Sequence, residues 1–485
     1  MMIFKYWDKM FNEGIFLIRF MFIVVLASYN SFHGMSYAQS KMDRPNIVLY
    51  LADDLGTMDI GPYGNKHVKT PNLDKLSQKS ILFNQAFSTA TTCAPSRSAL
   101  FTGLYPQRNG SHSNRVAVRD TVKSIVQYFV NEGYRVAIAG KLDVGPRQVF
   151  PFEYIPGTNR REPGTEGKKG MFPDLYLEPV DKWFADRDPS QPFLLIVSDH
   201  STHMSWPLHP EYTAENVNIP PFHVDTKDTR QLRARYYTDI TKLDYNVGET
   251  MKMLERHQLE DNTIVLFTAD QGPQLPFGKW TLYDYGVQVP LIVSWPGHVK
   301  KKSKTDALVS HVDIIPTLLE MVGGKVPEGI DGQSFYSAVK DPNQSHRESV
   351  FANHNGDKFY DQSPSRMLRT SSYKYIVNLE PEMPASAGKK PYPSWIKKAE
   401  IDAKAKVVVD RLNQRPAEEL YDLKADRYEM KNLAGLPKYK KLIEGFRKQM
   451  EVVRNAQGDI GDNWKKDLEK LPADNKPNPL IPYQF

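Results

Sequence analysis

Four apolar segments of the sequence end in side chains that can bind ions or transfer protons. These endings are Asp53 with Asp54, Lys141 with Asp143, Asp199 with His200 and His203, and Asp270 with Gln271. Ligands of an open α/β sheet bind beyond the carboxyl ends of its strands, so such endings converge on one site. Three aspartates and a glutamine form an all-oxygen ligand set, which favours calcium first, magnesium second, and disfavours zinc. A turn or helix cap after a strand is the alternative role of the Asp53-Asp54 pair.

The only cysteine of the chain, Cys93, is the second feature with chemical potential. It has no partner for a disulfide within the chain, although exported proteins usually pair their cysteines. A small buried residue or a spare thiol is the alternative interpretation.

The elements that must position these residues are short strands alternating with helices. The four apolar segments are Asn46 to Ala52, Arg135 to Ala139, Phe193 to Val197 and Thr263 to Thr268. Their consecutive branched residues are typical of strands buried on both faces. A helix face is indicated by Tyr236, Ile240, Leu243, Val247, Met251 and Leu254. Strand and helix in alternation predict an α/β sandwich with a mostly parallel sheet.

The region after about residue 345 differs in character, and we predict two domains, a catalytic one at residues 39–345 and a smaller one at residues 346–485. Tyr373 to Val377 is strand-like and lies among charged, proline-rich loops. A terminal amphipathic helix is indicated by Tyr439, Leu442, Ile443, Phe446, Met450 and Val453. We expect this basic helix to dock by its apolar face; a membrane or partner surface is the alternative.

Residues 1–38 resemble a signal peptide that directs export to the periplasm or the medium. Basic residues precede the apolar stretch Met21 to Ala27, and the small-residue site Ser36-Tyr37-Ala38 follows. A retained membrane anchor is the alternative, because Ile15 to Ile18 extend the apolar region. Removing three basic and two acidic residues takes the net charge from +6 to +5. This suits an anionic substrate, whereas the scattered Lys and Arg argue against nucleic acid.

The run C-A-P-S-R-S-A-L-F-T-G from Cys93 to Gly103 resembles the signature of the type I sulfatases, in which a maturation enzyme oxidises the cysteine to formylglycine. The resemblance continues in P-N-I-V-L-Y-L-A-D-D-L-G from Pro45, T-P-N-L-D-K-L from Thr70, D-N-T-I-V-L-F-T-A-D-Q-G from Asp261, V-P-L-I-V from Val289 and E-L-Y-D-L from Glu419. It implies an alkaline-phosphatase-like sandwich with a large, mostly parallel central sheet and a smaller C-terminal α+β domain with an antiparallel sheet.

The same resemblance implies roles for individual residues. The metal ligands would be Asp53, Asp54, Asp270, Gln271 and an oxygen of the modified Cys93. Arg97 would lie beside the nucleophile, and its i, i+4 spacing from Cys93 supports this if the segment opens a helix. Lys141, His203 and Lys279 match positions that bind sulfate oxygens and assist the leaving alcohol, while Asp270 suits the base that activates the nucleophile.

One segment departs from the family pattern. Many relatives read K-x-H after the second strand, whereas this chain reads Gly140-Lys141-Leu142-Asp143. Our hypothesis is that the Asp143 carboxylate replaces the histidine as the base that resets the nucleophile. The alternative is that Asp143 only orients its loop, or pairs with Lys141 or Arg97. His200 and His112 are other candidate bases.

We expect the substrate to be a sulfated polysaccharide or oligosaccharide such as ulvan, carrageenan or a glycosaminoglycan. The Lys141 segment and the later P-F-E-Y run from Pro151 are similar to sulfatases that act on N-sulfated glucosamine. Trp206 and Trp280 favour a sugar, although Trp206 is equally suited to the core. The alternatives are a sulfamidase, a phosphoester hydrolase of the same superfamily, and an inactive carbohydrate-binding relative. The sequence predicts no oligomeric state.

Overall fold

The computed structural model describes residues 44–160, 174–356, 363–382 and 392–459. The predicted signal peptide at residues 1–38 lies outside these ranges. Within them, no helix combines the length and the apolar character needed to cross a bilayer.

A large mixed sheet runs through the chain's main body, and the four predicted strands are confirmed in it. In spatial order its strands are β10 (Ser303–Ser310), β2 (Ile81–Phe87), β9 (Leu291–Ser294), β8 (Thr263–Ala269), β1 (Asn46–Ala52), β7 (Phe193–Asp199), β3 (Arg135–Gly140) and β4 (Glu153–Tyr154). Only β9 runs antiparallel to its neighbours in this sheet of the described residues. The central strands β8, β1 and β7 are buried at every position, as consecutive apolar residues predict.

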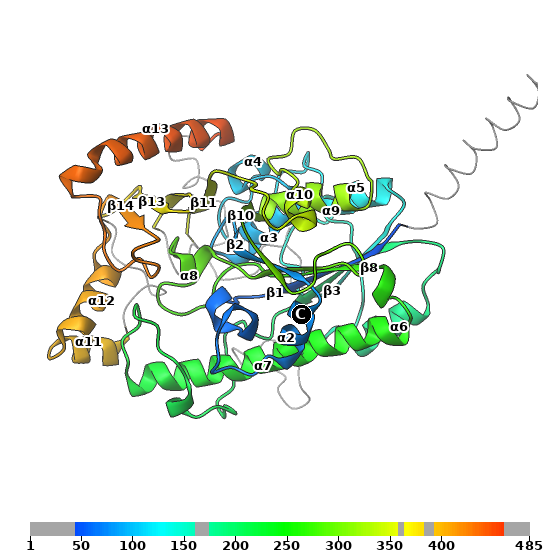
Figure 1. Cartoon of the computed structure of the whole chain (residues 1–485), viewed down its shortest axis with the longest axis horizontal. Helices are drawn as coiled ribbons and strands as arrows, with labels where there is room; N and C mark the ends of the chain where they lie inside the picture. The colour runs from blue at the N-terminus through cyan, green and yellow to red at the C-terminus, as the bar shows by residue number, and fades with distance from the viewer. Residues whose placement is uncertain (1–43, 161–173, 357–362, 383–391, 460–485) are drawn as a thin grey trace, which may run out of the picture. The chain divides into compact units, whose positions relative to one another are not determined.

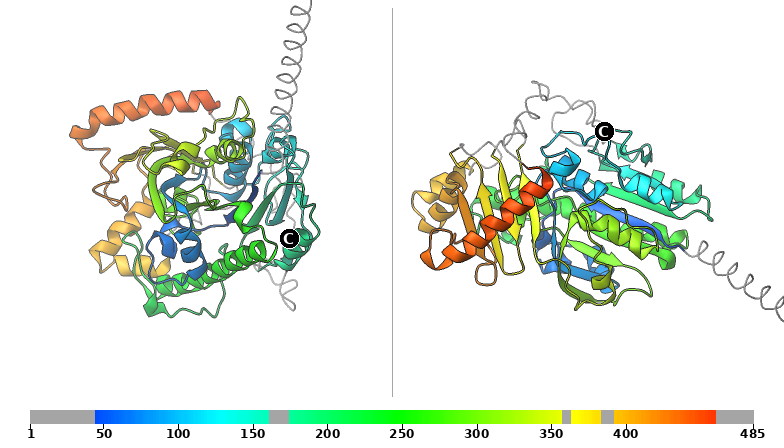
Figure 2. Two further views of the ribbon diagram at one scale, coloured as in Figure 1. Left: turned by 45° about the vertical axis from the view of Figure 1, so that its right-hand side comes forward. Right: turned by 90° about the horizontal axis from the view of Figure 1, so that it is seen from above.

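Helices cover both faces of this sheet (Figures 1 and 2). One layer contains α3 (Cys93–Thr102), α5 (Ile125–Asn131), α9 (Ile314–Met321) and α10 (Tyr336–Lys340), and the other contains α2 (Pro71–Gln78), α6 (Glu178–Ala185) and α7 (Lys227–Arg256). The predicted helix face from Tyr236 to Leu254 is confirmed in α7, where Met251 alone of its six residues is only partly buried. The short helices α4 (Pro106–Asn109) and α8 (Asp284–Val287) lie in connecting segments.

A second sheet is antiparallel and follows the first in sequence. Its strands are β11 (Val350–His354), β12 (Ser365–Arg369), β13 (Tyr373–Asn378) and β14 (Glu418–Asp422). The helix α13 (Lys440–Gln457) crosses these strands in Figure 2, and Phe446 stacks on Tyr375 at 5.7 Å. The predicted docking of this helix is therefore confirmed. The helices α11 (Pro393–Ala399) and α12 (Ala403–Asn413) precede β14.

The two sheets pack together, and the described residues from Asn46 onward form one compact unit. The division at residue 345 remains a prediction. A shared apolar cluster contains Phe87 from β2 and Ala352 from β11. Buried ion pairs accompany this apolar contact. Nζ of Lys374 on β13 lies 2.5 Å from Oδ1 of Asp284 on α8 and 2.6 Å from Oε1 of Glu429.

Replacing Lys374 with methionine removes the cation that faces Glu429 in this buried network. The free energy of unfolding should fall by about 3–5 kcal/mol, the usual effect of breaking a buried ion pair. Denaturant unfolding measures the difference, and Lys424→Met at an exposed position is the control, expected to change by less than about 0.5 kcal/mol. Equal stability of the two variants would contradict the prediction.

Candidate active site

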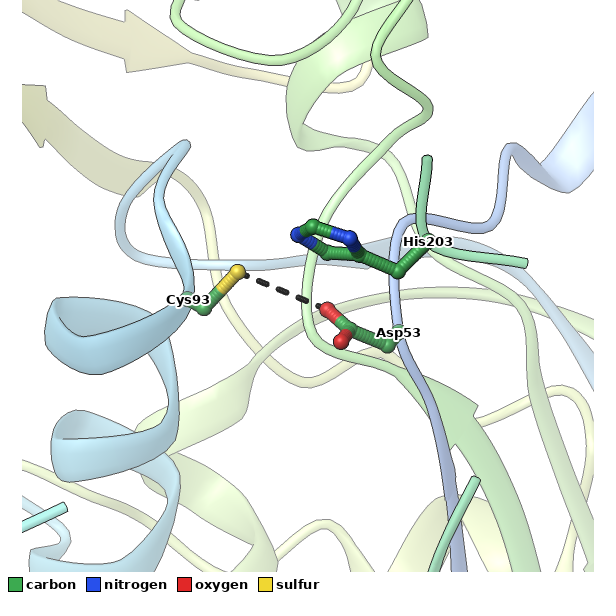
Figure 3. A group of neighbouring side chains, drawn as sticks. All are labelled: Asp53, Cys93 and His203. Carbon is green, nitrogen blue, oxygen red and sulfur yellow. Dashed lines mark hydrogen bonds between the residues drawn. The ribbon is translucent and has the colours of Figure 1, made fainter. Parts of the chain in front are cut away.

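Cys93 is the first residue of α3, at the carboxyl edge of the large sheet. Thr92 before it has an extended backbone, and the left-handed Gly103 ends the helix. The Cys93 side chain is buried. Figure 3 shows its sulfur pointing toward the Asp53 carboxylate, with the His203 ring beside that carboxylate. The peptide N–H groups at the start of a helix favour negative charge, which suits a site for an anionic substrate.

Three carboxylates converge on this position from the adjacent strands β1 and β8. One oxygen each of Asp53, Asp54 and Asp270 lies within 4.8 Å of the other two. Asp54 has a φ of 61°, in the left-handed region, and its backbone N–H donates to Oδ1 of Asp270 at 3.0 Å. A turn that is strained for a non-glycine residue is therefore held by the partner strand's carboxylate.

The sulfur of Cys93 contacts three of the predicted site residues. It lies 3.4 Å from Oδ1 of Asp53, 3.1 Å from Nε2 of Gln271 and 3.2 Å from Nζ of Lys279. These residues come from the end of β1, the end of β8 and the loop that precedes α8. The structure thus brings the nucleophile candidate into contact with both strand ends.

Three buried cations surround the carboxylates. Lys141 Nζ donates to Oδ2 of Asp53 at 2.7 Å, and Lys279 Nζ donates to Oδ2 of Asp54 at 2.8 Å. Arg97 donates through Nε to Oδ2 of Asp270 at 2.8 Å, and its side chain has no exposed surface. Arg97 lies one helical turn after Cys93 on α3, and its role beside the nucleophile stays a prediction.

Burial and charge act on the acids in opposite directions. Burial alone would raise the pKa of Asp53, but the nearby Lys141, His203, Arg97 and Lys279 hold this pKa well below its ordinary value. Burial, with help from the Asp53 charge, raises the pKa of Asp270 to about 7. Burial and then Asp53 raise the pKa of the Cys93 thiol well above its ordinary value. An unmodified Cys93 is therefore a poor thiolate nucleophile in this setting.

The acidic residues fit a hard divalent cation. The carboxylates of Asp53, Asp54 and Asp270 would supply oxygen ligands to such an ion. The Oε1 atom of Gln271 is buried and has no hydrogen-bond partner among the described residues, so its lone pairs remain for a cation. An all-oxygen set of this kind suits calcium or magnesium better than zinc.

Asp143 and His203 also lie at this edge. Asp143 is buried, has a φ of 52° and places Oδ2 3.3 Å from Nζ of Lys141. His203 Nε2 lies 3.7 Å from Oδ2 of Asp54, and its Nδ1 lies 2.6 Å from the carbonyl oxygen of Met204. Burial, reinforced by Lys279, lowers the pKa of His203, so this imidazole is mostly neutral near pH 7.

Other residues near the strand ends have structural contacts instead. The Asp199 carboxylate accepts hydrogen bonds from Tyr50 at 2.6 Å and from Asn246 at 2.9 Å, so it turns away toward α7. Trp206 is buried, and its ring packs on Tyr236 at 5.0 Å, which places it in the core. His200 is buried, and neither of its ring nitrogens has a hydrogen-bond partner within the described part of the chain.

Two serines that hold the site were missed by the sequence reasoning. Ser198 Oγ accepts a hydrogen bond from Nη1 of Arg97 at 2.6 Å. Ser96, inside the C-A-P-S-R motif, donates to the Asp270 carbonyl oxygen at 2.5 Å. Its place in the motif was a signal that could have revealed Ser96, whereas nothing near Ser198 in sequence points to Arg97.

Comparison with known proteins agrees with this geometry. The Sulfatase family model matches residues 45–324, and the model for the C-terminal part of N-sulphoglucosamine sulphohydrolase matches residues 273–384. An ulvan-active sulfatase of Formosa agariphila is 34% identical over 426 residues, which cover 86% of this chain and 81% of that protein.

Two solved structures share the fold at lower identity. One, a complex with its substrate D-glucosamine-2-N,6-O-disulfate, has a TM-score of 0.63 at 19% identity and covers 88% of this chain and 100% of that one. The other is a phosphonate monoester hydrolase of Agrobacterium radiobacter, with a TM-score of 0.67 at 18% identity. The match covers 85% of this chain and 96% of that one. The alkaline-phosphatase-like fold is therefore confirmed.

The family match and the relative at this identity make the protein a sulfuric ester hydrolase. The chain belongs to the type I sulfatase family, as the motif at Cys93 predicts.

Replacing Ser198 with alanine should weaken the alignment of Arg97, because one charge-assisted hydrogen bond is lost. Such a bond contributes about 1.5–3 kcal/mol, so kcat/KM should fall by roughly 10- to 100-fold. Steady-state kinetics with an aryl sulfate measures the change. Ser201→Ala is the matched control, because the Ser201 hydroxyl bonds only Asp199 and Asn246 among the described residues. A loss of equal size in that control would contradict the assigned role of Ser198.

Proposed function

We propose that the protein hydrolyses sulfate esters of a sulfated polysaccharide or oligosaccharide, with formylglycine formed from Cys93 as the nucleophile and calcium as the cation. The observation that carries this proposal is the contact of the Cys93 sulfur with Asp53, Gln271 and Lys279 in a buried cluster of acids and cations. Formylglycine, once formed, supplies a hydrated aldehyde oxygen as nucleophile in place of the thiol.

A carbohydrate substrate is supported by the relatives. The Formosa agariphila protein is named as ulvan-active, and one structural neighbour holds a disulfated glucosamine as its substrate. The second candidate function is cleavage of N-sulfated glucosamine. It is favoured by the match of residues 273–384 to the C-terminal model of N-sulphoglucosamine sulphohydrolase.

The chain's own side chains can neutralise and protonate such a substrate. Sulfate oxygens repel an anionic nucleophile, and buried Arg97, Lys141 and Lys279 offset that repulsion in a low-dielectric site. A bound cation, held by Asp53, Asp54, Asp270 and Gln271, supplies further neutralising charge. We propose that Asp270 accepts the proton of the attacking hydroxyl. The departing sugar oxygen receives its proton from Lys279, or from the fraction of His203 that is protonated.

We further propose that Asp143 replaces the missing histidine as the base for the second half of the cycle. Its carboxylate lies beside Lys141 and is buried at the same edge. We also propose that the protein is exported to the periplasm or the medium, and that a maturation enzyme oxidises Cys93. Both rest on the sequence motifs.

The direct test is a screen of purified protein, co-expressed with a maturation enzyme, against defined sulfated oligosaccharides and phosphate esters. We expect inorganic sulfate from at least one sulfated carbohydrate, slower or absent phosphate release, and loss of both in Cys93→Ala. Faster phosphate release would favour the phosphoester hydrolase, and no turnover of any ester would favour an inactive binding protein.

Calcium should stabilise the folded protein, because it binds a carboxylate cluster that only folding assembles. At a calcium concentration about 100 times Kd, the free energy of unfolding should rise by about 2.7 kcal/mol. Thermal unfolding with calcium, magnesium or chelator measures the rise. Asp53→Asn should lose it, whereas Asp261→Asn, exposed near the opposite end of β8, should keep it. A larger response to magnesium would overturn the choice of calcium.

Replacing Asp143 with asparagine should lower kcat by at least about 100-fold, the lower range for losing a general base. The first turnover should stay fast, so rapid-mixing kinetics should show a burst of released alcohol before slow steady state. A residue that only pairs with Lys141 would give no burst, and unchanged kcat would exclude the hypothesis.

A further inference from the structure

Two buried asparagines near the nucleophile lack hydrogen-bond partners. Asn353 has no exposed surface, and Asn355 is 2% exposed. Neither the nitrogen nor the oxygen of either amide has a partner among the residues that the structure describes. Buried polar groups in proteins are nearly always paired, so two neighbouring unpaired amides call for a ligand or another explanation.

The backbone places these asparagines beside the segment that leads into Cys93. Asn353 forms a parallel bridge with Ala90, and its N–H donates to the Thr89 carbonyl oxygen at 2.9 Å. The next residues along the two segments are also in contact, because Oγ1 of Thr91 lies 3.0 Å from Nδ1 of His354. Continued by one residue in the same register, this pairing sets Asn355, which directly follows β11, opposite Thr92, the residue before Cys93.

The alternation of side chains along β11 puts Asn353 on the same face as Phe351. Ala352 and His354 share the other face, and Asn355 directly follows the strand. Phe351 packs edge-on against Tyr105 at 5.6 Å and belongs to a cluster with Ala99 of α3. The Asn353 amide therefore faces the side on which the nucleophile's helix lies, and Figure 1 shows β11 close to α3 and β2.

The chain opposite this face is polar as well. Residues 105–114 run alongside β11 and the two residues that follow it. Tyr105 contacts Phe351, and the Asn114 N–H donates to the Gly356 carbonyl oxygen at 3.4 Å. Between those contacts, the amide of Gln107 and the hydroxyl of Ser111 are buried and unpartnered within the described ranges. This flank thus carries uncharged donors and acceptors, in contrast to the charged groups around Cys93.

We propose that Asn355, with Asn353 behind it, binds hydroxyl groups of the sugar that carries the scissile sulfate. An amide offers one acceptor and two donors, which match the donor and acceptor of a sugar hydroxyl. Arg97, Lys141 and Lys279 bind the anionic sulfate, so the asparagines read the uncharged part of the substrate. An extended chain rises about 7 Å over two residues, a span suited to one sugar ring. This inference rests on the function proposed above.

The test compares a sugar substrate with one that lacks sugar hydroxyls. For wild type and Asn355→Leu, kcat/KM is measured with sulfated ulvan oligosaccharides and with 4-nitrophenyl sulfate. The ratio of the two values should fall at least about tenfold in the variant, as expected for a lost hydrogen bond to substrate. Because leucine needs no partner, Tm should stay the same or rise. Asn355→Ala provides the same comparison if the leucine variant does not fold.

Asn378→Leu is the matched control. Asn378 is buried on β13 in the same sheet, and its amide donates to Pro416 at 2.7 Å and to Glu419 at 2.9 Å. This variant should lower Tm and leave the substrate ratio at the wild-type value. An unchanged ratio in Asn355→Leu, or equal losses with both substrates, would overturn the inference alone. A wild-type enzyme that hydrolyses only the aryl sulfate would overturn both the inference and the proposed function.

Discussion

The mutual repulsion of three buried carboxylates is the constraint on which the rest of this structure depends. Asp53, Asp54 and Asp270 approach one another within 4.8 Å at the ends of two adjacent strands. Such a cluster is tolerated only when nearby cations compensate it. Arg97, Lys141 and Lys279 each pair with a different one of these carboxylates. The fold must therefore deliver three cations from three separate elements to one point.

Sheet order explains how the fold achieves this. The strands β8, β1, β7 and β3 lie side by side and parallel, so their carboxyl ends share one edge. Helix α3 starts at that edge and carries both Cys93 and Arg97. The small sheet adjoins the same edge, because β11 runs beside Thr89 to Thr91. The cations that balance the three carboxylates are thus also the cations that a sulfate ester requires.

Much of this arrangement could be predicted from sequence, because it depends on local patterns. Consecutive apolar residues predict the strand at Asn46 to Ala52, and residue spacing predicts α7. The direction of a side chain at a strand end is not local: Asp199 follows a strand as Asp53 does, yet it bonds Tyr50 and Asn246. The role of Ser198 likewise depends on Arg97, 101 residues away in sequence. Partners brought together only by tertiary packing leave no pattern in a single sequence.

The measurement that tests this account most directly is the chemical state of Cys93 in active protein. Preparations with different extents of oxidation, obtained with and without a co-expressed maturation enzyme, are compared by peptide mass spectrometry and by sulfate release. We predict that specific activity rises in proportion to the fraction of Cys93 converted to the aldehyde. Full activity in protein whose Cys93 remains an unmodified thiol would contradict the account.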